Sequence, residues 1–175
     1  MTSSYPPLYA CIVGVNLKWR RVATIPMLHF AYGSNLSAKF LRQHCPTAVF
    51  QMKAELSNFR ITFPFYSQKR QGGISSIIPA PGELVRGVLY EVNQREMEEL
   101  DVVESVPQGL YIRETYLVLA EDKRWHSADL YRCAKPTGPY APARSYVELM
   151  FEGAEEHQLD PNYVKELRWL INSLG

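Results

Sequence analysis

Apolar and polar positions alternate along several short segments of the chain, a pattern typical of strands with one buried face. The first of these segments, residues 28–32, runs directly into Gly33-Ser34-Asn35. Further strands are expected over residues 58–63, 74–78, 84–92, 112–120 and 127–134. A turn is expected at residues 79–82, where two prolines and a glycine separate two apolar runs.

Helices are expected where a capping residue precedes apolar positions at helical spacing. The segments are residues 37–44, a helix that starts at residue 93, and residues 143–157 and 161–174. The residues expected to cap three of them are Ser37, Asn93 and Asp160. Glu96 completes a capping-box pattern with Asn93, and Met97, Leu100 and Val103 should form the buried stripe of that helix. Many short strands with few helices between them favour an antiparallel or mixed sheet curled towards a barrel over a doubly wound fold.

Composition narrows the class of protein. The chain has 175 residues, 46% of them hydrophobic, which suits one globular domain. A formal net charge of +1 gives no reason to expect nucleic acid or a membrane surface as partner. No uninterrupted apolar run approaches the ~18–20 residues of a membrane span. The three cysteines are odd in number and far apart, so neither a disulfide framework nor a zinc site is expected, and a reducing cytoplasm fits best.

The first 26 residues differ from the rest, because they carry Lys18, Arg20 and Arg21 and no acidic residue. We interpret residues 1–26 as an N-terminal extension and residues 27–175 as the domain. Two alternatives remain for the extension: an added edge strand over residues 9–15, or a targeting leader.

The Gly33-Ser34-Asn35 segment is the first candidate for chemistry. A strand that runs into such a segment and then into a helix can leave several main-chain N–H groups pointing the same way, which favours binding of a carboxylate or phosphate. Gly33 permits either a close approach of a ligand to the main chain or a positive φ. The alternative is an ordinary strand-to-helix turn.

The ten residues from Met27 to Leu36, Met-Leu-His-Phe-Ala-Tyr-Gly-Ser-Asn-Leu, resemble the opening of the γ-glutamylcyclotransferase-like family. Later blocks follow in the order of that family: Gly72-Gly73-Ile74, Pro81-Gly82-Glu83-Leu84-Val85-Arg86-Gly87-Val88-Leu89-Tyr90, Leu100-Asp101-Val102-Val103-Glu104, Gly109-Leu110-Tyr111 and Ser145-Tyr146. The resemblance covers roughly residues 27–171. It implies an α+β fold, a small mixed or antiparallel β-barrel flanked by helices.

The resemblance also implies an activity. In this family the α-amine of a γ-glutamyl compound attacks its own γ-carbonyl and releases 5-oxoproline and a free amine. This reaction requires neither a metal nor an organic cofactor. The implied partner is a small γ-glutamyl substrate, handled by a monomer or homodimer.

Glu104 matches the acidic position of the family and is our candidate for the catalytic carboxylate. It follows Val102-Val103, and apolar neighbours would raise its pKa, as a group that acts as base and then as acid requires. The alternative is an exposed acid near a helix end. Related sequences often carry glycine after this glutamate, whereas here Ser105 follows.

The resemblance implies that other residues bind the glutamyl group of the substrate. They are Tyr32, Gly33, Ser34, Asn35, Leu36, Tyr111 and Tyr146. Packing in the core or on the surface is the alternative role for each tyrosine. Four arginines stay unassigned and are interpreted as solvated strand positions: Arg60, Arg70, Arg86 and Arg113. The pocket for the leaving amine is expected to come from the loops at residues 67–73 and 136–142.

Other chemistries find less support. His44 and Cys45 are adjacent, but neighbours on a helix point about 100° apart, so Cys45 is interpreted as a core residue rather than a nucleophile. The other histidines lack metal-ligand spacing, and no P-loop or dinucleotide fingerprint is present. A non-catalytic member of the fold, which binds a γ-glutamyl ligand or another protein, is the alternative function. Glutathione-specific relatives carry an apolar residue where Asn35 stands, so we expect γ-glutamyl amino acids or amines as substrates before glutathione.

Overall fold

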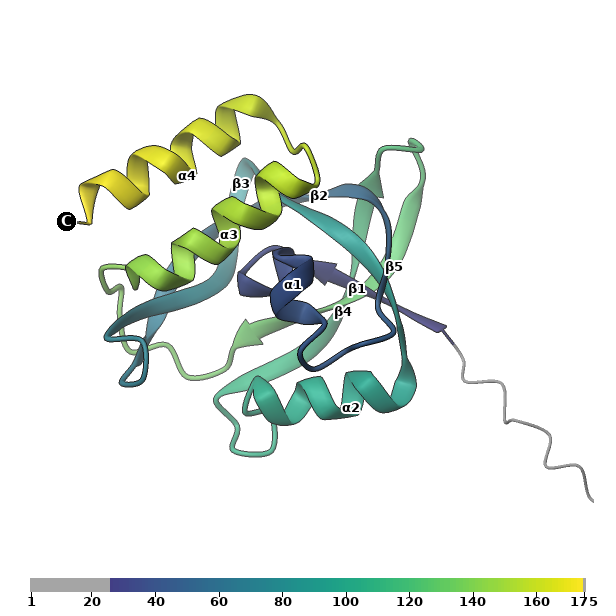
Figure 1. Cartoon of the computed structure of the whole chain (residues 1–175), viewed down its shortest axis with the longest axis horizontal. Coiled ribbons are helices and arrows are strands. Elements are labelled where there is room, and N and C mark those ends of the chain that lie inside the picture. Colours follow the sequence, from purple (N-terminus) through teal and green to yellow (C-terminus); the bar gives the residue numbers. More distant parts are fainter. Residues whose placement is uncertain (1–25, 175) are drawn as a thin grey trace, which may run out of the picture.

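The computed structural model describes residues 26–174 and contains a closed barrel of five strands flanked by helices (Figure 1). Its elements are β1 (Pro26–Ala31), the 3₁₀ turn η1 (Ser34–Leu36), α1 (Ala38–Leu41), β2 (Val49–Ser67), β3 (Gly72–Asn93), α2 (Gln94–Val103), β4 (Tyr111–Ala120), β5 (Trp125–Cys133), α3 (Arg144–Glu156) and α4 (Pro161–Ser173). The strands follow the order β1-β3-β2-β4-β5, and a parallel pairing of β1 with β5 closes the barrel. The other pairings are antiparallel, so the expected mixed α+β barrel is confirmed.

Two strands are longer than the sequence pattern suggested. The turn expected at residues 79–82 is wrong, because β3 continues through it. Asn58 of β2 faces residues 80–83 there in a wide irregularity, and its side-chain oxygen accepts a hydrogen bond from the Gly82 amide at 3.0 Å. The strand expected to stop before Pro64 also continues, with a register shift at that proline. Local bulges therefore accommodate the prolines that would otherwise interrupt the hydrogen-bonded ladder.

The helix caps agree with the sequence better than the helix lengths do. The side chains of Ser37, Asn93 and Asp160 each accept a hydrogen bond from a main-chain amide in the first turn of the helix that follows. The first helix is shorter than expected and covers only Ala38–Leu41. Val103, expected on the buried stripe of α2, is 42% exposed. A helix has 3.6 residues per turn, so each step of three residues rotates the position by about 60° around the helix. Val103 therefore lies about 120° from Met97.

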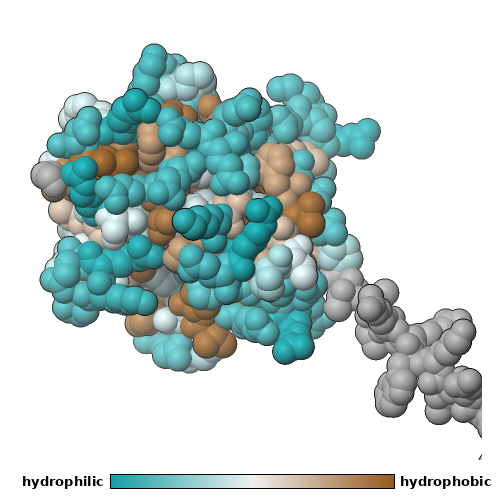
Figure 2. Space-filling model, viewed as in Figure 1, coloured by the Kyte–Doolittle hydropathy of each residue, from teal (hydrophilic) through white to brown (hydrophobic). Residues whose placement is uncertain are grey.

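The side chains form two packed regions. One fills the barrel and includes Phe30, Leu89 and Leu130, while the other lies between the barrel and the helices and includes Leu36, Tyr90 and Met150. Helices α3 and α4 lie together on one side of the barrel, and α2 lies on another (Figure 1). The outward surface in the same view is largely hydrophilic, with separate hydrophobic spots (Figure 2).

Helix α3 packs directly against the turn that follows β1, and Gly153 permits this contact. A Cβ atom at Gly153 would lie 2.3 Å from the carbonyl carbon of Leu36 and 2.5 Å from the amide nitrogen of Ser37. The helix thus supports the Gly33-Ser34-Asn35 segment from behind. The supporting contact needs a residue without a side chain.

The N-terminal extension assigned to residues 1–26 and the edge strand considered for residues 9–15 lie outside the described residues. Pro26 is the exception, since it begins β1 opposite Asn93. Between residues 26 and 174, none of the helices has the length and apolar character needed to cross a bilayer.

Replacement of Gly153 by alanine should destabilise the fold. The new methyl group would meet main-chain atoms that cannot rotate away, and such overpacking costs roughly 1–3 kcal/mol. Urea unfolding of Gly153→Ala measures this loss. The control is Glu152→Ala at the exposed neighbouring position, which should change the free energy of unfolding by less than about 0.5 kcal/mol. Equal stability of the two variants would contradict the packing argument.

Candidate active site

A small pocket opens where β1 ends and the η1 turn begins. It is partly open to solvent, and its cavity volume is about 20 Å³. The residues that line it come from β1, η1, β3, α2, β4, β5 and α3: His29, Phe30, Ala31, Tyr32, Gly33, Ser34, Asn35, Ser75, Glu104, Tyr111, Tyr131 and Tyr146. Seven of the eight residues assigned from the sequence therefore lie around one cavity.

Glu104 and Asn35 meet inside this pocket. Glu104 is the C-cap of α2, and its Oε1 accepts a hydrogen bond from the Asn35 side-chain amide at 3.0 Å. The residue is partly exposed at the helix end, but its carboxyl group lies in the pocket. Burial raises the pKa of Glu104 to about 7, against the opposing effects of the Asn35 hydrogen bond and the positive charge of Arg70. A carboxyl group with this pKa can exchange a proton near neutral pH.

The turn from Gly33 to Leu36 is built by main-chain hydrogen bonds from Leu36 N to Gly33 O and from Ser37 N to Ser34 O. Gly33 has φ −104°, so a positive φ is not why glycine stands here. A Cβ at Gly33 would lie 2.5 Å from the Tyr146 hydroxyl and 2.6 Å from the Ser75 hydroxyl. Glycine leaves room for these two hydroxyls, which approach the main chain closely.

Three buried tyrosines complete the wall. Tyr111 donates to the main-chain oxygen of Ser75 at 2.8 Å, and the hydroxyls of Tyr146 and Ser75 share a hydrogen bond of 2.8 Å. Tyr32 donates to the main-chain oxygen of Tyr131. Burial raises the pKa of Tyr32, Tyr111 and Tyr146, so all three hydroxyls stay protonated at neutral pH. They act as fixed hydrogen-bonding groups rather than as bases.

Leu36 is the one assigned residue that does not line the pocket. Its side chain is fully buried between the barrel and the helices, and its carbonyl accepts a hydrogen bond from the Tyr90 hydroxyl. Sequence reasoning missed five residues of the wall: His29, Phe30, Ala31, Ser75 and Tyr131. Ser75 follows the Gly72-Gly73-Ile74 block, so the sequence carried a signal for it.

Two buried atoms of the pocket residues have no hydrogen-bond partner among the residues described: the side-chain oxygen of Asn35 and Nε2 of His29. His29 donates through Nδ1 to the main-chain oxygen of Asp129 at 3.0 Å. Burial lowers the pKa of His29 to about 4, so the ring is neutral and Nε2 carries a lone pair. The pocket therefore offers two acceptors to a ligand that carries N–H groups.

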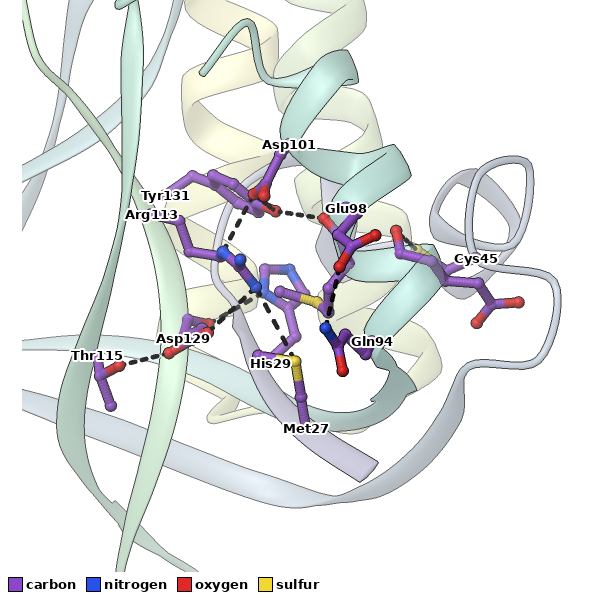
Figure 3. Close-up of polar contacts among 12 residues, drawn as sticks. Met27, His29, Cys45, Gln94, Glu98, Asp101, Arg113, Thr115, Asp129 and Tyr131 are labelled. Carbon is purple, nitrogen blue, oxygen red and sulfur yellow. Dashed lines mark hydrogen bonds and ion pairs between the residues drawn. The ribbon is translucent and has the colours of Figure 1, made fainter. Parts of the chain in front are cut away.

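A side-chain network fixes the end of α2 that carries Glu104 (Figure 3). Asp101, three residues before Glu104, accepts a hydrogen bond from the Tyr131 hydroxyl at 2.8 Å and pairs with Arg113 at 3.1 Å. Arg113 also pairs with Asp129 of β5 at 3.4 Å. The interpretation of Arg113 as a solvated strand position is therefore wrong. Its partners are acids from two other elements, which the sequence does not reveal.

Other residues weighed from the sequence have structural roles. Arg60 and Arg86 are strand residues paired with Glu83 and Glu55 across the β2–β3 ladder. Glu96 is buried, and its carboxylate accepts hydrogen bonds from the amide and hydroxyl of Thr47.

Cys45 is fully buried in the core, and burial raises the pKa of its thiol to about 12. This supports its interpretation as a packing residue rather than a nucleophile. No group of three His, Cys, Asp or Glu residues within 26–174 is arranged to hold a metal ion.

The chain is similar to several known proteins. Residues 84–167 match the model of the AIG2-like family. The chain is 31% identical to γ-glutamylcyclotransferase of Bos taurus over 144 residues, which cover 80% of this chain and 76% of the relative. It is 31% identical to the Homo sapiens protein of the same name over 146 residues, or 81% of this chain and 77% of that one. A solved structure of a γ-glutamyl cyclotransferase superposes with a TM-score of 0.78 at 28% identity, covering 82% and 86% of the two chains.

Fold and pocket together define a helix-flanked barrel in which the carboxyl group of Glu104 faces a glycine-containing turn. The chain belongs to the γ-glutamylcyclotransferase family of enzymes.

Replacement of Ser105, the residue after Glu104, by glycine should stabilise the fold. The φ of Ser105 is +58°, a conformation that costs a non-glycine residue about 1–2 kcal/mol. Glycine removes this strain, but it also loses more backbone entropy on folding, which offsets part of the stabilisation. Ser105→Gly should therefore raise the free energy of unfolding by about 0.5–1 kcal/mol. Chemical denaturation measures the change, and Ser105→Ala, which keeps the Cβ, should leave it within about 0.5 kcal/mol. A destabilised glycine variant would show that the serine side chain has a role of its own.

Proposed function

We propose that this protein cyclises a γ-glutamyl amino acid or γ-glutamyl amine to 5-oxoproline and releases the free amine. Glu104 is the general base and then the general acid. The observation that carries the proposal is the position of its carboxyl group, hydrogen-bonded to Asn35 of the glycine-containing turn and buried enough to raise its pKa to about 7.

The proton balance explains why one carboxylate suffices. The α-amine of the substrate has a pKa of about 8 and is mostly protonated at neutral pH. Glu104 removes one proton, the amine nitrogen attacks the γ-carbonyl carbon, and the ring N–C bond forms. The bond from that carbon to the departing nitrogen then breaks as Glu104 returns the proton to that nitrogen. The ring nitrogen still carries one proton more than a lactam does, and Glu104 transfers this second proton in the same way, so the products are the neutral lactam and a protonated amine. No proton is gained or lost overall.

The rest of the catalytic effect comes from position. Because nucleophile and electrophile belong to one molecule, holding it in the folded-over conformation lowers the barrier without any covalent intermediate on the protein. In this proposal the main chain around Gly33, with Ser34 and Asn35, holds the glutamyl carboxylate. The hydroxyls of Tyr111 and Tyr146 are already fixed by Ser75 and shape the cavity. The unpartnered oxygen of Asn35 is available to the ammonium group.

The preference for γ-glutamyl amino acids or amines over glutathione rests on Asn35. Its amide binds Glu104, whereas an apolar residue at this position could not. A panel of γ-glutamyl dipeptides and amines, with glutathione included, tests this choice by release of 5-oxoproline.

Glu104→Gln should abolish turnover without abolishing binding. Glutamine keeps an oxygen for the Asn35 hydrogen bond but cannot carry the proton, and general acid–base catalysis contributes roughly 10²–10⁴-fold. We expect 5-oxoproline release to fall by at least about 10²-fold, while calorimetry still detects binding of the substrate. Glu98→Gln, at an exposed position of the same helix, is the control and should keep full activity. Unchanged turnover in Glu104→Gln would remove the mechanism, and binding without turnover in the wild-type protein would favour the non-catalytic alternative.

The raised pKa of Glu104 also predicts a pH dependence of stability. The folded state holds this proton up to about pH 7, whereas the unfolded chain releases it near pH 4.5, so the folded state loses stability as the pH rises between these values. Glu104→Gln cannot ionise, so it should be more stable than the wild type at pH 8 and nearly equal at pH 4.5. Thermal unfolding across this range measures the difference. A gap that does not depend on pH would show that the carboxyl group has an ordinary pKa.

A further inference from the structure

Arg70 occupies an unusual position beside the pocket. It lies in the connection between β2 and β3, where its amide donates to the Ser67 hydroxyl at 3.2 Å. Its guanidinium lies 5.3 Å from the ring centre of Tyr146 on α3 and 5.4 Å from that of Phe40 on α1. Both distances suit cation–π contacts, so two rings from separate elements hold the charged group in place. The interpretation of Arg70 as a solvated strand position is therefore wrong.

Among residues 26–174 the guanidinium has no ionic partner. No carboxylate of residues 26–174 lies within 4.0 Å of it. Its charge nevertheless reaches the pocket, because it lowers the pKa of Glu104 against the larger effect of burial. A planar group with five N–H donors, held rigidly and left unpaired, is suited to bind a carboxylate.

Arg70 also borders a second, open hollow beside the start of α3. The hollow is lined by residues of the two loops expected to receive the leaving amine, Arg70-Gln71-Gly72 and Tyr140-Ala141-Pro142. The hydrogen bonds from Gly73 N to Ala141 O and from Ala143 N to Gly73 O join these loops. The Tyr146 hydroxyl lies at the pocket and its ring contacts the Arg70 guanidinium, so Arg70 stands between the pocket residue Tyr146 and the hollow.

We infer that Arg70 binds a carboxylate carried by the departing amine, and so selects γ-glutamyl amino acids over uncharged γ-glutamyl amines. This inference rests on the proposed cyclisation and adds a specificity residue to it. The carboxylate of the glutamyl group itself stays at the Gly33 turn. Arg70 takes no part in bond making.

A matched pair of substrates tests the inference. γ-Glutamyl-alanine and γ-glutamyl-alaninamide differ only in the carboxylate of the departing residue. The wild-type protein should favour the carboxylate substrate in kcat/KM, and Arg70→Gln should reduce that preference by roughly 10- to 100-fold. The loss should appear in KM for γ-glutamyl-alanine, with the amide substrate changed by less than about threefold. Comparing each variant with the wild type cancels the different basicities of the two leaving amines.

The control is Lys69→Gln, an exposed cation in the same loop, which should keep the wild-type preference. If Arg70→Gln does not fold, Arg70→Lys replaces it, since it keeps the charge but loses the planar fork and should show an intermediate preference.

An equal loss for both substrates would overturn the inference, because Arg70 would then act on Glu104 or on the glutamyl group. An unchanged preference would also overturn it. Absence of 5-oxoproline from both substrates would instead refute the proposed function. Calorimetry would then still report whether Arg70→Gln weakens binding of the carboxylate compound alone. Failure of both turnover and binding would remove both proposals.

Discussion

The hydrogen bond between Asn35 and Glu104 is the contact on which the site depends. It joins the turn after the first strand to the end of α2, two segments 69 positions apart in the chain. A carboxyl group in this cavity would otherwise be without a fixed orientation, and burial would keep it protonated over a wider pH range. The hydrogen bond from the Asn35 amide opposes the effect of burial and lowers the pKa of Glu104 to a value at which both protonation states are populated near neutral pH. A raised pKa with a fixed direction is what a group that first accepts and then donates a proton requires.

Much of the fold could be read from local patterns in the sequence. The capping residues Ser37, Asn93 and Asp160 mark real helix starts, and the alternation before Gly33 marks a real strand. These features depend on a few neighbouring residues, so a pattern can reveal them. The limits of β2 and β3 could not be read in the same way. A Pro-Gly segment is compatible with a turn or with a bulge, and the choice depends on Asn58 of the opposite strand.

The same distinction between local patterns and long-range pairing applies to the site residues. The residues that carry the family motifs could be named beforehand because each block is short and contiguous. His29, Ser75 and Tyr131 enter the pocket through the pairing of strands. His29 lies within the Met27–Leu36 block and Ser75 follows Gly72-Gly73-Ile74, whereas nothing near Tyr131 in the sequence indicates its place in the pocket. The arginines show the limit most clearly. Arg60 and Arg86 remain ordinary strand residues. Arg70 and Arg113 instead find their partners on other elements: Phe40 and Tyr146 for the first, Asp101 and Asp129 for the second.

The network around Arg113 has a consequence for how this protein fails. Strands β1 and β5 meet through the register pair His29 and Asp129, and the same Asp129 receives Arg113, which in turn holds Asp101 on α2. The same set of ion pairs and hydrogen bonds therefore joins β1 to β5, the seam of the barrel, and holds the end of α2 that carries Glu104. Opening the seam releases α2, and releasing α2 weakens the seam. Heat inactivation and loss of tertiary structure should thus coincide in a single transition, with no folded but inactive intermediate between them.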